Sequence, residues 1–150
     1  MENKIINKCG ECSHCCDIPI IKELKKGAFK LCSHYCKGCT IYKKRPKECS
    51  AFECAYYQME TVNIALRPDK CGVMFEMISD NIFLGTLHPD YEFTDVAKKQ
   101  INAFNCQGFS VVLSRKNEKL KFYVSSKHNV NDIYIEFFKI YNEEWQHQVI

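Results

Sequence analysis

The sequence predicts an α+β fold, in which a cysteine-rich N-terminal part packs on a small antiparallel sheet with helices, in a ββαββα-like order. Two observations predict it. Nine of the 11 cysteines lie before residue 60, whereas hydrophobic periodicity typical of strands and helices is regular only after it. A length of 150 residues suits one domain. We therefore treat 1–150 as a single domain, made of a cysteine-cluster part, 1–58, and an α+β part, 59–150.

The α+β part begins with a predicted hairpin and a helix. Gly72–Ile78 and Ile82–His88 are strand-like segments, and the Ser-Asp-Asn run between them is typical of a tight turn. Thr94 is typical of a helix N-cap, and Gly108 is typical of a helix end. The spacing therefore predicts a helix between Thr94 and Gly108.

The same order then repeats. Phe109–Arg115 and Lys119–Ser126 predict a second hairpin, and Asn131 predicts the N-cap of a last helix. An aromatic stripe at helical spacing follows: Tyr134, Phe137, Phe138, Tyr141 and Trp145. Such a stripe typically packs against a sheet. The repeated ββα order is compatible with an internal duplication, and a common meander topology explains it equally well.

Two helices are predicted in the cysteine-cluster part. Ile18–Lys30 predicts a short helix that starts at Pro19 and is broken at Gly27. Pro46–Thr61 predicts a second helix, because proline suits a first helical turn and apolar residues recur at helical spacing after it.

The number and placement of the cysteines indicate metal ligands rather than disulfides. The count is odd, and Cys15 and Cys16 are adjacent, which disulfide geometry disfavours. The first residues lack the apolar core of a secretory signal, and no run approaches the roughly 18 unbroken apolar residues of a membrane span. We therefore expect a cytoplasmic protein without a membrane segment, in which thiols stay reduced.

The first cysteine motif is C-x2-C-x2-C-C, formed by Cys9, Cys12, Cys15 and Cys16. Two-residue spacing lets successive thiolates converge on one ion while backbone amides donate to sulfur. The motif overlaps the run of cysteines in ferredoxins, so zinc and an iron–sulfur cluster both remain open. Adjacent side chains point in different directions, so the doublet could serve two neighbouring metal positions.

A second motif supplies five more sulfurs: Cys32, Cys36, Cys39, Cys49 and Cys54. Arg45 is a candidate donor to a thiolate-rich anion, with a solvated surface charge as the alternative. His14 and His34 lie inside the two cysteine motifs and could each replace a sulfur. With nine cysteines nearby, we expect both to be polar loop residues and Cys36 to be a loop thiol rather than a ligand. For Cys71 and Cys106 we expect packing roles.

These motifs resemble the CxxCxxCC cysteine-cluster family, described as a zinc- or iron-chelating domain. Its pattern is CxxCxxCC, a further cysteine, and a C-x-I-Y-x-x-R-P-x-x-C-x-x-F-x-C block. Eight cysteines match: Cys9, Cys12, Cys15, Cys16, Cys32, Cys39, Cys49 and Cys54. Ile41, Tyr42, Arg45, Pro46 and Phe52 match as well. The resemblance spans residues 9–54.

The resemblance implies chelation of zinc or iron by these eight thiolates and no general activity. One branch of the family, the flagellin lysine methylases, joins a similar cluster to methyl transfer. Residues 59–150 contain no cofactor fingerprint for that chemistry. The sequence therefore identifies no catalytic residue.

The charge distribution bears on the choice of partner. Residues 1–58 carry 11 Lys/Arg against 6 Asp/Glu, a balance of +5, and residues 59–150 carry 10 against 12, a balance of −2. Eight thiolates with two divalent ions would add about −4, which brings the first part near neutrality. The sequence thus disfavours nucleic acid as a partner, and it leaves an unknown protein or small molecule open.

Three classes of function remain: a structural zinc module, an iron–sulfur redox or methyl-transfer-related enzyme, and a zinc module that binds nucleic acid or protein. A closed zinc site would hold a segment with little apolar pattern of its own in a folded state. An iron–sulfur cluster would add redox chemistry. The absence of a finger spacing with histidines argues against the third class.

Overall fold

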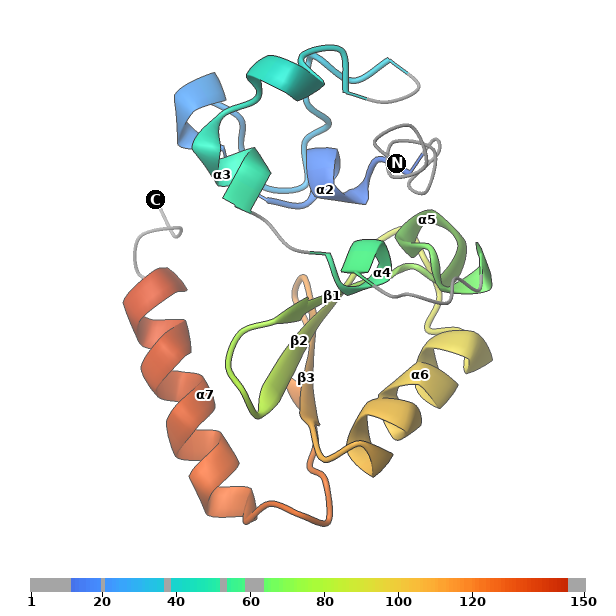
Figure 1. The fold of residues 1–150 in the computed structure, drawn as a ribbon, viewed down its shortest axis with the longest axis vertical. Helices are drawn as coiled ribbons and strands as arrows, with labels where there is room; N and C mark the ends of the chain where they lie inside the picture. The colour runs from blue at the N-terminus through green and yellow to red at the C-terminus, as the bar shows by residue number, and fades with distance from the viewer. Residues whose placement is uncertain (1–11, 20, 37–38, 52–53, 59–63, 146–150) are drawn as a thin grey trace.

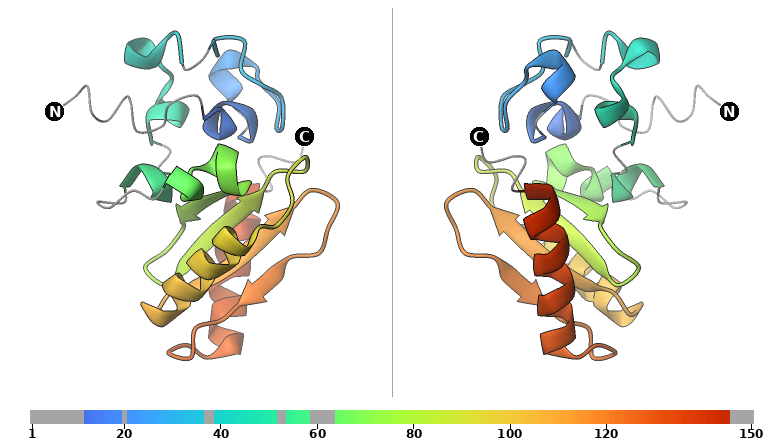
Figure 2. Two further views of the ribbon diagram at one scale, coloured as in Figure 1. Left: turned by 90° about the vertical axis from the view of Figure 1, so that its right-hand side faces the viewer. Right: turned by 90° about the vertical axis from the view of Figure 1, so that its left-hand side faces the viewer.

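The chain forms a four-stranded sheet between two helices, with the cysteine-rich segment at one end of this sheet (Figures 1 and 2). The computed structural model describes residues 12–19, 21–36, 39–51, 54–58 and 64–145. We call the described residues 12–51 the cysteine lobe and the described residues 54–145 the sheet part. In the described part of the chain, no helix is both long and apolar enough to cross a membrane.

The elements of the cysteine lobe are short. They are α2 (His14–Asp17), η1 (Lys22–Leu24), η2 (Tyr42–Lys44) and α3 (Lys47–Ala51). The sheet part then contains α4 (Ala55–Gln58), η3 (Ile64–Leu66), α5 (Pro68–Cys71), β1 (Val73–Met77), β2 (Ile82–Leu87), α6 (Asp95–Cys106), β3 (Ser110–Arg115), β4 (Lys121–Tyr123) and α7 (Val130–Trp145). The order from β1 to α7 is ββαββα, as the sequence predicts.

The sheet is mixed, so the expectation of an antiparallel sheet is wrong at its centre. The strand order is β1-β2-β3-β4. The two hairpins are antiparallel, whereas β2 and β3 run parallel, with Ile82 opposite Ser110 and Leu87 opposite Arg115. The physical reason is α6, because a helical crossover returns the chain to the same edge of the sheet and makes neighbouring strands parallel.

Alternation along the strands gives each face of the sheet its own helix (Figure 2). One core cluster joins the sheet to α6: Cys71, Val73, Phe75, Phe83, Leu87, Ala97, Ile101, Phe104, Val111 and Leu113. The opposite cluster joins it to α7: Ile82, Leu84, Val112, Ile133 and Phe137. The sheet part therefore holds its own apolar core on both faces, and Cys71 is the only predicted packing cysteine that belongs to it.

Local signals placed both ends of α6 correctly, since Thr94 is its N-cap and Gly108 follows its C-cap, Gln107. The Thr94 hydroxyl accepts a hydrogen bond from the Ala97 amide at 3.3 Å, which confirms the predicted N-cap of α6. For α7 the expected cap is wrong by two residues. The Asn129 side chain accepts from the Asn131 amide at 2.9 Å, so Asn129 is the capping residue.

The aromatic stripe of α7 is wider than the face that packs on the sheet. Phe137 is buried and Tyr141 is half-buried, whereas Tyr134 and Phe138 are exposed. Tyr134 stacks on Phe122 of β4 with ring centroids 4.1 Å apart. Core packing is therefore confirmed for Phe137, while Tyr134 covers the edge of the sheet.

The predicted helix over Ile18–Lys30 is wrong. Its described residues form a loop with one 3-10 turn, an isolated bridge between Ile21 and Lys26, and a left-handed conformation at Lys25 (φ 52°). The second predicted helix, Pro46–Thr61, is realised in part by α3 and α4. Cys54 lies between these two helices and pairs with Glu76 of β1, so helical hydrogen bonding does not continue through it.

The outcomes for the two remaining cysteines differ. Cys71 is 1% exposed and its thiol donates to the carbonyl of Val73 at 3.3 Å, which confirms a packing role. Cys106 is exposed on the last turn of α6, so its expected burial is wrong. The buried residues of α6 are Ala97, Ile101 and Phe104, and Cys106 is not among them.

Gly72 lies between α5 and β1, against Tyr91, and leads to a first prediction. Its φ is 80°, and a Cβ at this position would lie 2.6 Å from the Cβ of Tyr91. We expect Gly72→Ala to lower the free energy of unfolding by about 2 kcal/mol or more, from left-handed strain and overlap together. Urea unfolding measures the change.

Gly27→Ala is the matched control for this substitution. The φ of Gly27 lies outside the positive range, and a Cβ would make only an ordinary contact, 3.5 Å from the Lys30 Cδ. We expect a change within about 0.5 kcal/mol. Equal effects of the two substitutions would contradict the role given to Gly72.

Candidate metal centre

The structure describes seven of the eight predicted metal ligands, and Cys9 lies outside the described residues. Cys12, Cys16, Cys32, Cys39, Cys49 and Cys54 are half-buried, whereas Cys15 is exposed. None of these seven forms a disulfide. Cys36, which was expected to be a loop thiol, is exposed as well.

Four thiols of the cysteine lobe act electrostatically on one cation or on one another. The Cys32 amide donates to the Cys16 carbonyl at 2.9 Å, which brings the two motifs together. The charges of Cys16, Cys32 and Cys49 all act on the Lys26 ammonium, and the charges of Cys16, Cys32 and Cys39 act on Cys49. We call Cys16, Cys32, Cys39 and Cys49 the lobe cysteines.

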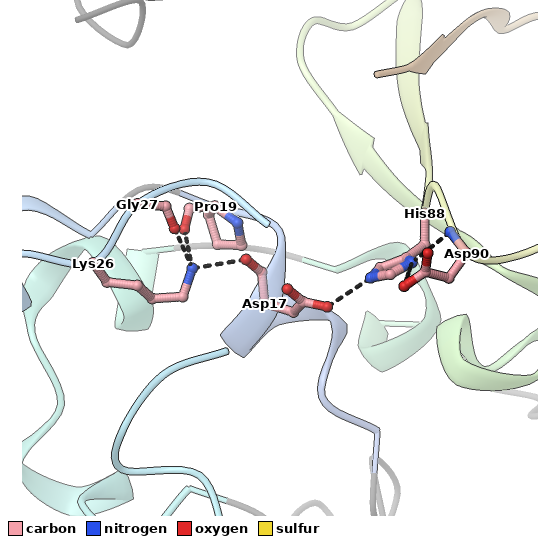
Figure 3. Close-up of polar contacts among 6 residues, drawn as sticks. All are labelled: Asp17, Pro19, Lys26, Gly27, His88 and Asp90. Atoms are coloured by element: carbon pink, nitrogen blue, oxygen red, sulfur yellow. Dashed lines mark hydrogen bonds and ion pairs between the residues drawn. The ribbon is translucent and has the colours of Figure 1, made fainter. Parts of the chain in front are cut away.

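The cation beside this group is the buried side chain of Lys26, which is 8% exposed. Its ammonium donates to three carbonyls, those of Asp17 at 2.7 Å, Pro19 at 2.6 Å and Gly27 at 2.9 Å (Figure 3). Burial lowers the pKa of Lys26, while the charges of Asp17 and of the nearby thiols oppose this shift. The ammonium thus has a partner for each of its three protons and supplies positive charge next to sulfur.

Asp17 connects this cation to the sheet. Its carboxylate accepts a hydrogen bond from the His88 Nε2 at 2.6 Å, directly after β2 (Figure 3). The Asp90 amide donates to the His88 Nδ1 at 3.1 Å, so Nε2 carries the proton of a neutral ring. No local pattern predicts this contact, because Asp17 and His88 are 71 positions apart.

Cys12 and Cys54 form a second group at the junction between the cysteine lobe and the sheet part. The Cys12 sulfur accepts from the backbone amides of His14 and Asp69. Burial raises the pKa of the Cys12 thiol to about 12, and the charges of Asp69 and Cys54 add to this rise. Cys54 is fixed by its bridge to β1. We call Cys12 and Cys54 the junction cysteines.

His14 lies at the same junction, and the expectation of a polar loop residue is wrong for it. Its side chain is 2% exposed, and neither buried ring nitrogen has a hydrogen-bond partner among the residues that the structure describes. Its ring centroid lies 5.1 Å from that of Tyr91 and 5.2 Å from that of His88. Burial and the charge of His88 lower the pKa of His14 to about 4. His34, in the matching position of the second motif, is only half-buried.

The cysteine doublet and Arg45 also have defined positions. The Cys15 thiol hydrogen-bonds to Cys16 and lowers the pKa of Cys16 to about 7, so the two sulfurs lie together.

The Arg45 guanidinium stacks 4.0 Å from the centroid of the Tyr42 ring, and its charge lowers the pKa of Cys49 against the larger effect of burial. Arg45 therefore acts on a thiol and also contacts an aromatic face.

The donors fit a soft metal. Thiols of half-buried cysteines, amides that donate to sulfur and a nearby buried cation are what zinc and iron–sulfur sites use. Within the part of the chain that the structure describes, no three side chains of His, Cys, Asp or Glu converge closely enough to hold an ion. The fit therefore rests on the kinds of donor present and on their grouping.

Lys26 leads to a second prediction. We expect Lys26→Met to lower the stability of the cysteine lobe by about 3 kcal/mol, because three buried carbonyls would lose a charged donor. Amide hydrogen exchange of Ile18, Ile21 and Phe29 would report the loss. Lys22→Met, on an exposed lysine of the same loop, is the control and should leave exchange unchanged. Unchanged hydrogen exchange of the lobe amides in Lys26→Met would contradict this role of Lys26.

Comparison with known proteins gives no match. No family model, no curated protein and no solved structure matches the chain. The resemblance to the CxxCxxCC family therefore rests on the residues of its cysteine motifs.

Proposed function

We propose that the protein chelates zinc or iron through about eight cysteine thiolates: Cys9, Cys12, Cys15, Cys16, Cys32, Cys39, Cys49 and Cys54. The observation that carries this proposal is a set of thiols outside disulfides in the cysteine lobe, three of which act electrostatically on the buried ammonium of Lys26. Thiolates are the form that binds metal, and a fixed positive charge offsets their repulsion. Zinc is the first choice for the ion.

The role that we propose for the ion is to hold the cysteine lobe folded. Among the described residues of this lobe, the buried aliphatic side chains are those of Ile18, Ile21 and Pro46, whereas the sheet part has a core on both faces. Structural zinc contributes on the order of 10 kcal/mol in small domains, which suits a segment with so few buried apolar groups. Thiols that stay reduced also suit the cytoplasm.

An iron–sulfur cluster, in a redox or methyl-transfer-related enzyme, is the second candidate. It is favoured by backbone amides that donate to sulfur, as from His34 to Cys32 at 3.4 Å, because such bonds tune cluster potentials. A zinc module that binds nucleic acid or protein is less favoured. The thiolates neutralise the basic excess of the N-terminal part, so an unknown protein or small molecule is the better partner.

The first test is metal content. We expect protein purified without oxygen to contain stoichiometric zinc and to show no visible absorption. Iron with acid-labile sulfide and a broad visible band would support the second candidate instead. Cys49→Ser should reduce the metal content, whereas Cys106→Ser, on an exposed thiol remote from the motifs, should not. Protein with neither metal and with all thiols reactive would overturn the proposal.

Metal removal is a separate prediction. We expect a strong chelator to abolish amide protection in the cysteine lobe, for example at Ile21 and Cys32, because the lobe lacks a large apolar core. Protection at Val112 and Leu113 should persist, since both lie in the cores of the sheet part. Hydrogen exchange followed by mass spectrometry measures both. Retention of protection in the lobe after metal loss would contradict a structural role.

A further inference from the structure

The outer face of α7 carries most of the large apolar side chains that the described residues leave exposed. In the right-hand view of Figure 2, α7 lies in front of the sheet and no other described element crosses it. Six such side chains are exposed in the described part of the chain, and four of them are on α7: Val130, Tyr134, Ile135 and Phe138. We call these four the outer patch. A contiguous exposed group of this kind typically marks an interaction site, whereas scattered single residues do not.

The side chains of the outer patch are neighbours on the helix. Val130, Tyr134 and Phe138 recur every four residues, which places them in one row. Ile135, which is 69% exposed, is three residues before Phe138 and therefore lies beside this row. The rings of Tyr134 and Phe138 have centroids 6.0 Å apart, and Tyr134 also stacks on Phe122 of β4. The patch is thus continuous, and the contact with β4 holds one of its rings in place before a partner binds.

Two opposite charges lie at one rim of the outer patch. Asp132 and Lys139 are exposed, and neither forms a salt bridge with another described residue. Asp132 is three residues before Ile135 and Lys139 is four residues after it, so both are neighbours of Ile135 on the helix surface. The two charges are seven residues apart, about 10 Å along the helix axis, and so they do not pair with each other.

This pattern is self-complementary when two α7 helices pack antiparallel. A two-fold axis beside Ile135 sets Asp132 of one copy opposite Lys139 of the partner subunit, and the symmetry repeats this pair. The apolar rows of the two helices then face each other beside the two ion pairs. A parallel pair would set identical residues at the same level and keep the opposite charges about 10 Å apart. The charges therefore favour a second copy of the chain, in one orientation, as the occupant of the patch.

We propose that the outer patch binds a second copy of this chain and forms a two-fold dimer in which the two α7 helices pack antiparallel. One helix face makes a small interface, so the dimer is weak and forms as the protein concentration rises. The patch belongs to the sheet part, whose cores are its own. This association therefore does not depend on a metal in the cysteine lobe.

Sedimentation equilibrium of the full chain tests the dimer. A reductant is present, because the exposed thiols of Cys15, Cys36 and Cys106 could otherwise link two chains. We expect a reversible change from monomer to dimer with rising concentration. A monomer at every concentration that can be reached overturns the proposal and leaves the patch to a different partner, and so does growth beyond the dimer, since a two-fold interface is closed.

Substitution in the outer patch tests its place in the interface. We expect Ile135→Glu to weaken dimerisation by about tenfold or more, because a charge would be buried at the centre of the contact. Met77→Glu is the matched control, since Met77 is also about half exposed but lies on β1, and it should leave dimerisation unchanged. Circular dichroism should show both variants folded. Dimerisation of Ile135→Glu at the wild-type affinity overturns the proposal.

Charge reversal tests the antiparallel orientation. Asp132→Lys and Lys139→Asp should each weaken the dimer by about fivefold, because two pairs of like charge would form. The double variant restores opposite pairs and should recover dimerisation. An equimolar mixture of the two single variants should also dimerise, because each pair in the mixed dimer then joins opposite charges. Failure of both the double variant and the mixture to recover dimerisation overturns the antiparallel pairing.

Discussion

The buried ammonium of Lys26 is the interaction on which the shape of the cysteine lobe depends. A charge that is 8% exposed is tolerated only with full hydrogen bonding, and three carbonyls from Asp17, Pro19 and Gly27 provide it. These carbonyls come from both ends of one loop. Their convergence therefore closes the loop and sets Cys16 and Cys32 beside the same positive charge.

Asp17 connects the Lys26 loop to the sheet part, because its backbone carbonyl and its side-chain carboxylate bind different partners. The backbone carbonyl accepts from Lys26, and the carboxylate accepts from His88 at the end of β2. The position of the lobe thus depends on the sheet part, whose cores do not require the lobe. Tyr91, packed on Gly72 and on His14, reinforces the same junction.

Sequence patterns were informative where the structure depends on neighbours in the chain. The strands, the Thr94 cap and the ββαββα order follow from local alternation and local hydrogen bonding. The parallel pairing of β2 with β3 was missed because it depends on the path of α6 across the sheet. The helix predicted over Ile18–Lys30 was also wrong, since the Lys26 side chain holds carbonyls that a helix would use for its own hydrogen bonds.

In the candidate site, too, local sequence patterns predict which residue types are present, while distant contacts decide how they are arranged. Spacing picked out the cysteines as candidates, but it could not separate the lobe cysteines from the junction cysteines, because that grouping depends on which charges lie near each thiol in the fold: Lys26 for the lobe cysteines and Asp69 for Cys12. His14 and His34 occupy the same Cys-Ser-His context, and yet only His14 is buried against Tyr91 and His88. Contact with Tyr91 and His88 of the sheet part accounts for this difference in burial. The same tripeptide thus places a half-buried histidine in one motif and a fully buried histidine in the other, because only His14 lies against the sheet part.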